Sequence, residues 1–396
     1  MSSFTVLYAS VGSRMDQFKV NLADGTLDKF AELELPDAVQ YAWMNSLRSI
    51  LYAACSDGRA PPRPPGTNHR LVAMRVDQRT GALSIHGGMS TLPGRAVHMT
   101  LDATNRYALV AYNNPPGATI HRISADGSLE KVTEHVQDVD FGHYPHQIRV
   151  TPSNKHVVVV SRGTRPNGKK QGTPGALKVA SYSEGQLKMH SSIEPNGGIN
   201  FGARHLDFHQ TKPWVYVSLE FENKLQMFGF ENDRFTEQPL YSRETLVNPT
   251  FVAPLQMAGT VHIHPNGRTV YVVNRANGTV EFQGRHFFSG GDNTMAVFSI
   301  DQQTGEPKLI QSEETRGMHA RTFSIDPSGR LMVVAHNHDV EVRNTSSIGS
   351  HTVYGGLSVF RILEEGKIEF LRKIDSDAVE NRQLLWSKLY QIAGGI

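Results

Sequence analysis

The chain has 396 residues, of which 39% are hydrophobic and 20% are charged, with a formal net charge of +2. This composition provides a sizeable core, and the near-neutral charge excludes the strongly basic surface of nucleic-acid or membrane-surface binding proteins. Cys55 is the single cysteine, so no internal disulfide can form. No apolar run approaches the roughly 20 residues that span a bilayer. The N-terminus lacks the pattern of a signal peptide, and we expect a cytoplasmic protein.

In chain order, the sequence repeats an apolar strand, a polar turn such as DPSGR, and a second strand rich in Val and Tyr. The copies cover residues 42–56, 100–113, 149–162, 207–220, 262–275 and 324–337. Aligned on the turn, they place Ser46, Ala103, Pro152, Gln210, Pro265 and Pro327 in register, 49 to 62 residues apart. Two further strands follow most copies. A period of about 50 residues with four strands per repeat is typical of a β-propeller.

The two ends of the chain complete the count of repeats. Residues 4–33 contain three strands that have no inner strand before them, and the apolar segment 383–391 is isolated and of strand length. Pairing the two would close a ring and remove an exposed sheet edge. The sequence therefore predicts an all-β, seven-bladed β-propeller with four-stranded antiparallel blades. It would be a single domain, 1–396, closed by N- and C-terminal strands in one blade.

The repeats also place polar residues at two fixed positions. The inner strand of a blade and its return strand bring the start of the first and the end of the second to one face. Ten residues after the aligned turn position stand Ser56, Asn113, Arg162, Glu220, Arg275 and Asn337. Six residues before it stand Gln40, Val97, His146, Arg204, Gly259 and Arg321, with His205 beside Arg204. We therefore expect a polar rim at the mouth of the central channel.

The expected rim carries four arginines, one acid and one histidine, with Asn113, His205 and Asn337 nearby. Cations removed from water are costly without partners, and the planar fork of arginine suits carboxylate or phosphate. The cluster therefore indicates an anionic ligand. Two other interpretations remain open: strand ends are often polar because they reach solvent, and Glu220 could be only the counter-ion of Arg204 or Arg275.

The longest loops, 57–70, 163–175, 276–293 and 338–355, all leave from the same rim. Long loops on one face of a rigid scaffold commonly carry function, so we expect them to form a collar or a lid. Segment 163–175 is expected to be a flexible surface loop. Segment 276–293, with three phenylalanines, is expected to be more ordered.

Several common site motifs are missing. The sequence has no HExxH, GxSxG, GxGxxG or GxxxxGK[ST], so no metal and no cofactor is expected. His262 and His264 are interpreted as surface or turn histidines at the far face. Cys55 is expected to be a buried structural thiol.

The stretches ARHLDFH and VYVSLE, followed by TVHIHPNGRTVYVVNR and RTFSIDPSGRLMVVAHN, resemble the lactonase family of seven-bladed propellers. Its members include propeller-type bacterial 6-phosphogluconolactonases and fungal 3-carboxy-cis,cis-muconate lactonizing enzymes. The resemblance covers nearly the whole chain and is strongest from about residue 140 to 337. It implies an active site of His146, Arg204, Glu220 and Arg275. The four long rim loops depart from the bacterial members and leave the substrate open.

The leading hypothesis is a metal-independent lactonase that hydrolyses a small anionic lactone. Arg204 and Arg275 would hold the anion and stabilise the oxyanion, Glu220 would act as a base or orient water, and His146 would be the general acid or base. Asn113, Arg162, His205, Arg321 and Asn337 would contact the substrate. One alternative is a cycloisomerase that closes a carboxylated muconate, and another is a non-catalytic binding scaffold. We expect a monomer or a weak homo-oligomer.

Overall fold

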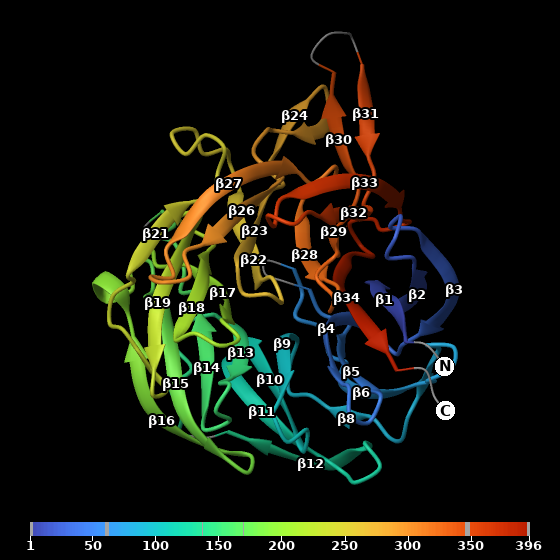
Figure 1. Ribbon diagram of the computed structural model, residues 1–396, viewed down its shortest axis with the longest axis vertical. Coiled ribbons are helices and arrows are strands. Elements are labelled where there is room, and N and C mark those ends of the chain that lie inside the picture. Colours follow the sequence, from blue (N-terminus) through green and yellow to red (C-terminus); the bar gives the residue numbers. More distant parts are fainter. Residues whose placement is uncertain (1–2, 60–62, 137, 169, 345–348, 394–396) are drawn as a thin grey trace.

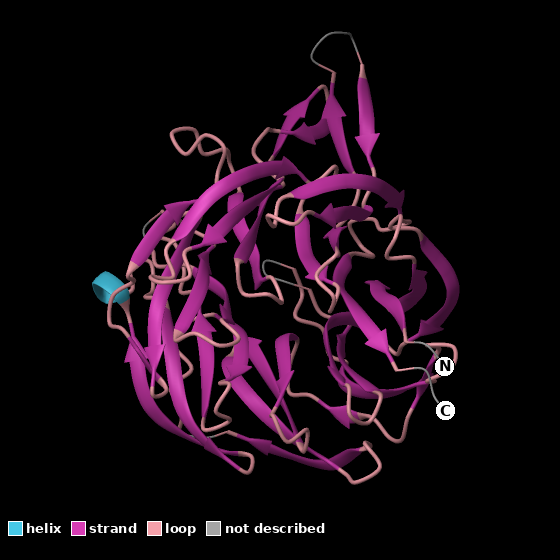
Figure 2. Ribbon diagram, viewed as in Figure 1, coloured by secondary structure: helices cyan, strands magenta, loops and turns pink. Residues whose placement is uncertain are grey.

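The computed structural model describes residues 3–59, 63–136, 138–168, 170–344 and 349–393. These residues form seven sheets around a common axis, with strands almost throughout (Figures 1 and 2). Within the described ranges, the helical structure is the 3-10 turn η1 (Pro195–Gly197). The predicted all-β, seven-bladed propeller is therefore confirmed.

The first four blades follow the repeats along the chain. The strands of each blade are listed from the inner strand outward. The first blade consists of β34 (Leu384–Ile392), β1 (Phe4–Val11), β2 (Arg14–Val20) and β3 (Leu27–Glu34), and the second of β4 (Ala38–Asn45), β5 (Ile50–Ser56), β6 (His69–Val76) and β7 (Leu83–Ile85), with β8 (Ser90–Thr91) also beside β6. The third consists of β9 (Ala96–Leu101), β10 (Tyr107–Asn113), β11 (Pro116–Ile123) and β12 (Leu129–His135), and the fourth of β13 (Pro145–Val150), β14 (His156–Ser161), β15 (Ala176–Ser183) and β16 (Gln186–Ile193).

The remaining three blades include two inserted hairpins. The fifth blade consists of β17 (Ala203–Phe208), β18 (Trp214–Leu219) and β19 (Lys224–Glu231), with β20 (Arg234–Phe235) and β21 (Tyr241–Glu244) beside β19. The sixth consists of β22 (Gln256–Ile263), β23 (Thr269–Ala276), β26 (Thr294–Ile300) and β27 (Pro307–Glu314). The seventh consists of β28 (Ala320–Ile325), β29 (Leu331–His336), β32 (Gly356–Ile362) and β33 (Ile368–Asp375). The hairpins are β24 (Thr279–Phe282) with β25 (Arg285–Phe288), and β30 (Val340–Arg343) with β31 (Ser350–Val353).

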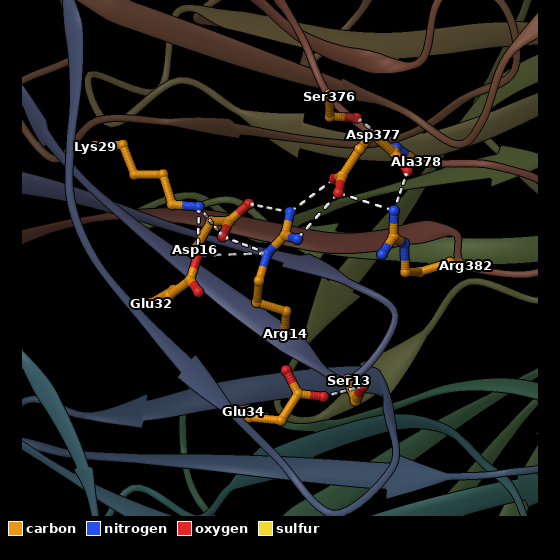
Figure 3. Close-up of polar contacts among 10 residues, drawn as sticks. All are labelled: Ser13, Arg14, Asp16, Lys29, Glu32, Glu34, Ser376, Asp377, Ala378 and Arg382. Atoms are coloured by element: carbon orange, nitrogen blue, oxygen red, sulfur yellow. Dashed lines mark hydrogen bonds and ion pairs between the residues drawn. The ribbon is translucent and has the colours of Figure 1, made fainter.

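The ring closes as predicted, because the C-terminal strand β34 pairs antiparallel with β1 and lies between the inner strands β28 and β4. Both chain ends therefore lie at one edge of the ring (Figure 1). A set of ion pairs bridges this seam (Figure 3). Arg14 contacts Asp377 at 2.7 Å and Asp16 at 2.8 Å, and Arg382 contacts Asp377 at 2.8 Å.

Buried tyrosines set the spacing between neighbouring blades. A tyrosine in the second strand of a blade donates its hydroxyl hydrogen to a glycine carbonyl in the outer hairpin of the next blade. The bond is 2.7 Å long in Tyr8–Gly81, Tyr52–Gly127, Tyr216–Gly305 and Tyr271–Gly366. The glycines have φ between 77° and 88°, the left-handed region that favours glycine. A buried phenol needs a partner, so the recurring tyrosine of the repeat links adjacent sheets.

Two of the long loops form hairpins that do not cover the ring. Hairpins β24–β25 and β30–β31 lie against each other, joined by the Arg285–Glu341 pair at 3.1 Å. In Figure 1 they project outward beyond the rim, so they are not the expected lid. Segment 163–175, expected to be flexible, has bridges between Thr164 and Thr173 and between Asn167 and Lys170. In the described part of segment 57–70, Arg59 donates a hydrogen bond to the backbone carbonyl of Asn381, just before β34, over 3.0 Å.

Candidate active site

Bulges in the inner strands determine the orientation of the side chains at the centre of the ring. Each of the seven inner strands has a register shift against its partner near the face on which it begins, which we call the site face. His146 is the extra residue between Pro145 and Gln147 in β13. Arg204 and Arg321 occupy the same place in β17 and β28. A β-bulge turns its side chain away from the regular alternation, and these bulges direct the three residues toward the ring axis.

Glu220 is the centre of a buried ion network. It follows β18 and is 2% exposed, and three arginines from three blades surround it. Arg162 contacts Oε1 at 2.5 Å, while Arg275 and Arg204 contact Oε2 at 3.0 Å and 3.2 Å. Burial raises the pKa of Glu220, but the arginines lower it more, to about 2. The carboxylate is therefore ionised and fully occupied as a counter-ion, which makes it a weak base.

The positive charge of the cluster exceeds its negative charge. Arg204 and Arg275 are 2% and 3% exposed. Burial and the charge of Arg275 lower the pKa of Arg204. Arg204 also donates to Thr260 Oγ1 at 3.2 Å, and Thr260 in turn donates to the Arg321 carbonyl at 3.2 Å. One carboxylate cannot neutralise these arginines, so the site is suited to an anion.

Two buried histidines lie beside the arginines. Burial, followed by Arg204 and Arg321, holds the pKa of His146 well below its usual range. Burial and Arg275 do the same for His319. Arg275 Nη1 donates to His319 Nε2 at 3.1 Å, and the Nδ1 atoms of His146 and His319 have no hydrogen-bond partner in the described structure. Both rings are therefore neutral at neutral pH.

Other expected site residues lie at different depths. Arg321 and Asn337 are at the site face, and Asn337 N donates to the His319 carbonyl at 3.2 Å. His205 lies behind His146, with ring centroids 5.3 Å apart, and next to His98 at 5.7 Å. Asn113 ends β10 and no contact joins it to the Glu220 network in the residues described.

Of the two histidines interpreted as surface or turn residues, His264 does lie in the turn that follows β22, although it is buried, whereas His262 lies within β22 and not in a turn. His262 Nδ1 lies 3.7 Å from Asp207 on the neighbouring inner strand β17. His264 is 7% exposed and bonds the Gly329 carbonyl at 2.8 Å. Asp207 also contacts Arg149 at 3.3 Å and accepts from Ile263 N at 3.0 Å. The group joins three adjacent inner strands, β13, β17 and β22, deeper along the axis.

The sequence reasoning missed Arg95, Tyr144 and His319. All three stand eight residues before the aligned turn position, two before the position we selected. Tyr144 and His319 adopt φ of 57° and 49°, and Gly202, at the same position of its blade, has φ of 60°. A left-handed backbone at a non-glycine residue costs about 1–3 kcal/mol and is common at functional sites. Reading the alignment two residues further upstream would have found them.

Other candidate sites in the described chain are a metal cluster, a cleft and the single cysteine. Within the described residues, no group of three His, Cys, Asp or Glu side chains is placed to hold a metal ion. A cleft of about 410 Å³ lies at the closing seam, lined by Arg14, Asp16 and Lys29 above an apolar floor. Its charged groups pair with one another, so we assign it a structural role. Cys55 is buried, and burial raises the pKa of its thiol, as the sequence predicted.

Among the described residues, no helix is long and apolar enough to cross a membrane.

A propeller with a buried arginine, histidine and glutamate cluster at one end of its axis matches a known class of protein. The family model "Lactonase, 7-bladed beta-propeller" matches residues 4–346. The chain belongs to this family of lactonases. It is 22% identical over 311 residues to a 6-phosphogluconolactonase from Formosa agariphila, covering 74% of this chain and 80% of that one. It is 24% identical over 315 residues to the 6-phosphogluconolactonase of Serratia proteamaculans, covering 78% and 81%.

Solved structures support the fold. A periplasmic gluconolactonase from Pseudomonas aeruginosa superposes with a TM-score of 0.71 at 19% identity, over 100% of both chains. A putative 6-phosphogluconolactonase from Bacteroides uniformis gives a TM-score of 0.73 at 15% identity, over 98% of this chain and 100% of that one. At this identity the likeness concerns the architecture alone.

Proposed function

We propose that this protein hydrolyses an anionic lactone, with a reaction like that of the 6-phosphogluconolactonases it is similar to. The observation that carries the proposal is the excess of buried arginine over carboxylate around Glu220. Such a site binds an anion and stabilises the negative charge that develops on a carbonyl oxygen under attack. The names of the relatives favour lactone hydrolysis over cyclisation of a muconate, although the same residue types would serve both reactions.

Roles follow from the geometry. Arg204 and Arg275 are fixed by Glu220 and face the centre, so they stabilise the oxyanion as water adds to the carbonyl. Glu220 positions these arginines and carries no proton at neutral pH, since its pKa is about 2. His146 is neutral and takes the proton of the attacking water. It returns that proton to the alkoxide oxygen when the ring C–O bond breaks, which leaves the hydroxy acid.

The charge of the substrate assists His146. Burial and the surrounding arginines hold its pKa low in the free protein. A bound anion offsets part of the arginine charge and raises the pKa of the imidazole, which makes it a stronger base in the complex. The pKa seen in the pH profile of kcat is therefore expected to exceed that seen in kcat/KM. Equal values would contradict this role of the substrate charge.

The test is a screen of sugar-acid lactones, 6-phosphorylated lactones and carboxymuconates at neutral pH, with and without a chelator. We expect turnover of an anionic lactone that persists with chelator. His146→Gln should lower kcat/KM by about 100-fold or more while the protein stays folded, and the exposed His351→Gln is the matched control. Loss of activity with chelator would overturn the metal-independent reaction. Turnover of muconates alone would favour cycloisomerase activity, and no turnover at all would favour the scaffold.

A further inference from the structure

Three polar side chains at the site face stand outside the Glu220 network. Arg95 immediately precedes the inner strand β9, Tyr144 immediately precedes β13, and Arg321 is the second residue of β28. Strands β9 and β13 are neighbours, while β28 contacts β22 and β34 on another part of the ring. The three residues therefore approach the axis from two sides.

Both arginines lack an acidic partner. In the described part of the chain, the ion pairs of Glu220 involve Arg162, Arg204 and Arg275, and neither Arg95 nor Arg321 pairs with a carboxylate. Burial, Arg275 and then the charge of Arg95 lower the pKa of Arg321 to about 9. Each guanidinium is partly buried at the site face without a carboxylate to neutralise it, which costs stability unless an anion binds there.

Tyr144 lies where it can complete this group. It stands at the register position that Arg95 occupies in the neighbouring blade, at the same end of the inner strands β13 and β9. Its ring also covers the guanidinium of Arg162, 4.1 Å from ring centroid to Cζ. The left-handed backbone at Tyr144 holds this orientation. Two guanidinium groups and a phenol hydroxyl are the donors that proteins use for phosphate or carboxylate oxygens.

We propose that Arg95, Tyr144 and Arg321 form an anion subsite that binds the phosphate or carboxylate of the substrate away from the reacting carbonyl. These residues then determine the preference for charged over neutral lactones. The proposal rests on the proposed lactonase function and names the groups that select its substrate. Arg204 and Arg275 serve the carbonyl, and the anion subsite serves the second charge.

The first test measures binding without turnover. Inorganic phosphate is titrated calorimetrically into the full chain at low ionic strength, with Arg95→Gln, Arg321→Gln and Tyr144→Phe beside the unchanged protein. Each arginine variant should weaken phosphate affinity by about tenfold or more, because a charge-assisted bond is lost. The control Arg316→Gln removes an exposed arginine that pairs with Glu313 at 2.9 Å and should leave affinity unchanged. Unchanged affinity in both Arg95→Gln and Arg321→Gln would overturn the proposal.

The second test compares kcat/KM for a 6-phosphorylated sugar lactone, a carboxylated lactone and the neutral parent lactone. A loss in Arg95→Gln that is about tenfold larger for the phosphorylated substrate than for the neutral one supports a phosphate subsite. The same excess for the carboxylated lactone supports a carboxylate subsite.

Equal losses of kcat/KM on all three substrates would overturn the subsite and leave the lactonase proposal intact. If no lactone reacts but the variants still lose phosphate binding, the lactonase proposal fails and the anion subsite stands. If Arg321→Gln does not fold, Arg95→Gln and Arg321→Lys still decide the matter.

Discussion

Arg275 donates a hydrogen bond from Nη1 to Nε2 of His319 over 3.1 Å. A guanidinium has no acceptor atom, so Nε2 must accept and the ring proton must lie on Nδ1. The same arginine holds Glu220 Oε2 through Nη2 at 3.0 Å. One side chain therefore fixes both the orientation of the carboxylate and the tautomer of the histidine, and it links the three blades whose inner strands are β17, β22 and β28.

Removing the charge of Glu220 should separate turnover from anion binding. In Glu220→Gln, Arg162, Arg204 and Arg275 lose their counter-ion and are no longer held in position. We expect kcat/KM to fall by about 100-fold or more, while inorganic phosphate binds more tightly because the site is more positive. Steady-state kinetics and calorimetry measure the two effects.

Glu222→Gln, two residues along the chain on a side chain paired with Lys224 at 3.2 Å, is the matched control and should change neither quantity. Weaker phosphate binding in Glu220→Gln, in a folded protein, would show that the carboxylate is not simply the counter-ion of the arginines.

Stability should fall on mild acidification. Burial lowers the pKa of seven histidines from 6.5, and they are His98, His146, His205, His209, His262, His319 and His336. Protons then bind the unfolded chain and not the folded one, so the stability is present above about pH 6.5 and is lost as the pH falls below it. Each such histidine contributes a slope of up to about 1.4 kcal/mol per pH unit.

Denaturant midpoints from pH 7.5 to pH 5 measure this slope. The ring of His98 packs against Tyr41, with ring centroids 4.0 Å apart. The variant His98→Phe should therefore show a smaller slope of stability against pH. The exposed His351→Gln should leave it unchanged. A flat profile in the unchanged protein would mean that these rings carry protons in the folded state.

Asp207 should stabilise three adjacent blades. Asp207→Ala leaves Arg149 without its partner at 3.3 Å and Ile263 N without its acceptor at 3.0 Å. The pair is partly shielded, so we expect a loss of about 2 kcal/mol, between the values for exposed and fully buried pairs. Denaturant unfolding measures it, with the exposed Asp28→Ala on β3 as control. A change below about 0.5 kcal/mol, which is usual for surface substitutions, would contradict the bridging role.

The C-terminal strand should matter far more than the ion pairs at the seam. Deleting residues 384–396 removes β34, the inner strand of its blade, which exposes the edge of β1 and uncovers the part of β28 that packs against β34. We expect loss of cooperative unfolding and binding of a hydrophobic dye. Asp377→Asn, which weakens the partly exposed pair with Arg14, should cost less than about 1 kcal/mol. A deleted chain that still unfolds cooperatively would show that the blade folds without its inner strand.

The propeller, its blade count and its closure by residues 383–391 could be predicted because they depend on local signals. Alternating Val and Tyr strands, polar turns and a constant spacing recur in each blade, and the isolated apolar segment at the end had one unpaired partner. The same register placed His146, Arg204, Glu220 and Arg275 on one face. The tyrosines of the repeat were visible too, although their glycine partners in the next blade were not.

Tertiary structure decided what those residues are able to do. The bulges that aim His146, Arg204 and Arg321 arise from pairing between strands, and a sequence read one strand at a time does not contain them. The number of arginines around Glu220 depends on distances between blades. Because three arginines contact this carboxylate, Glu220 is a counter-ion and not the base that the sequence suggested. The sequence by itself determined which face carries the chemistry; packing between blades determined which groups are charged, which are paired and which remain free for a substrate.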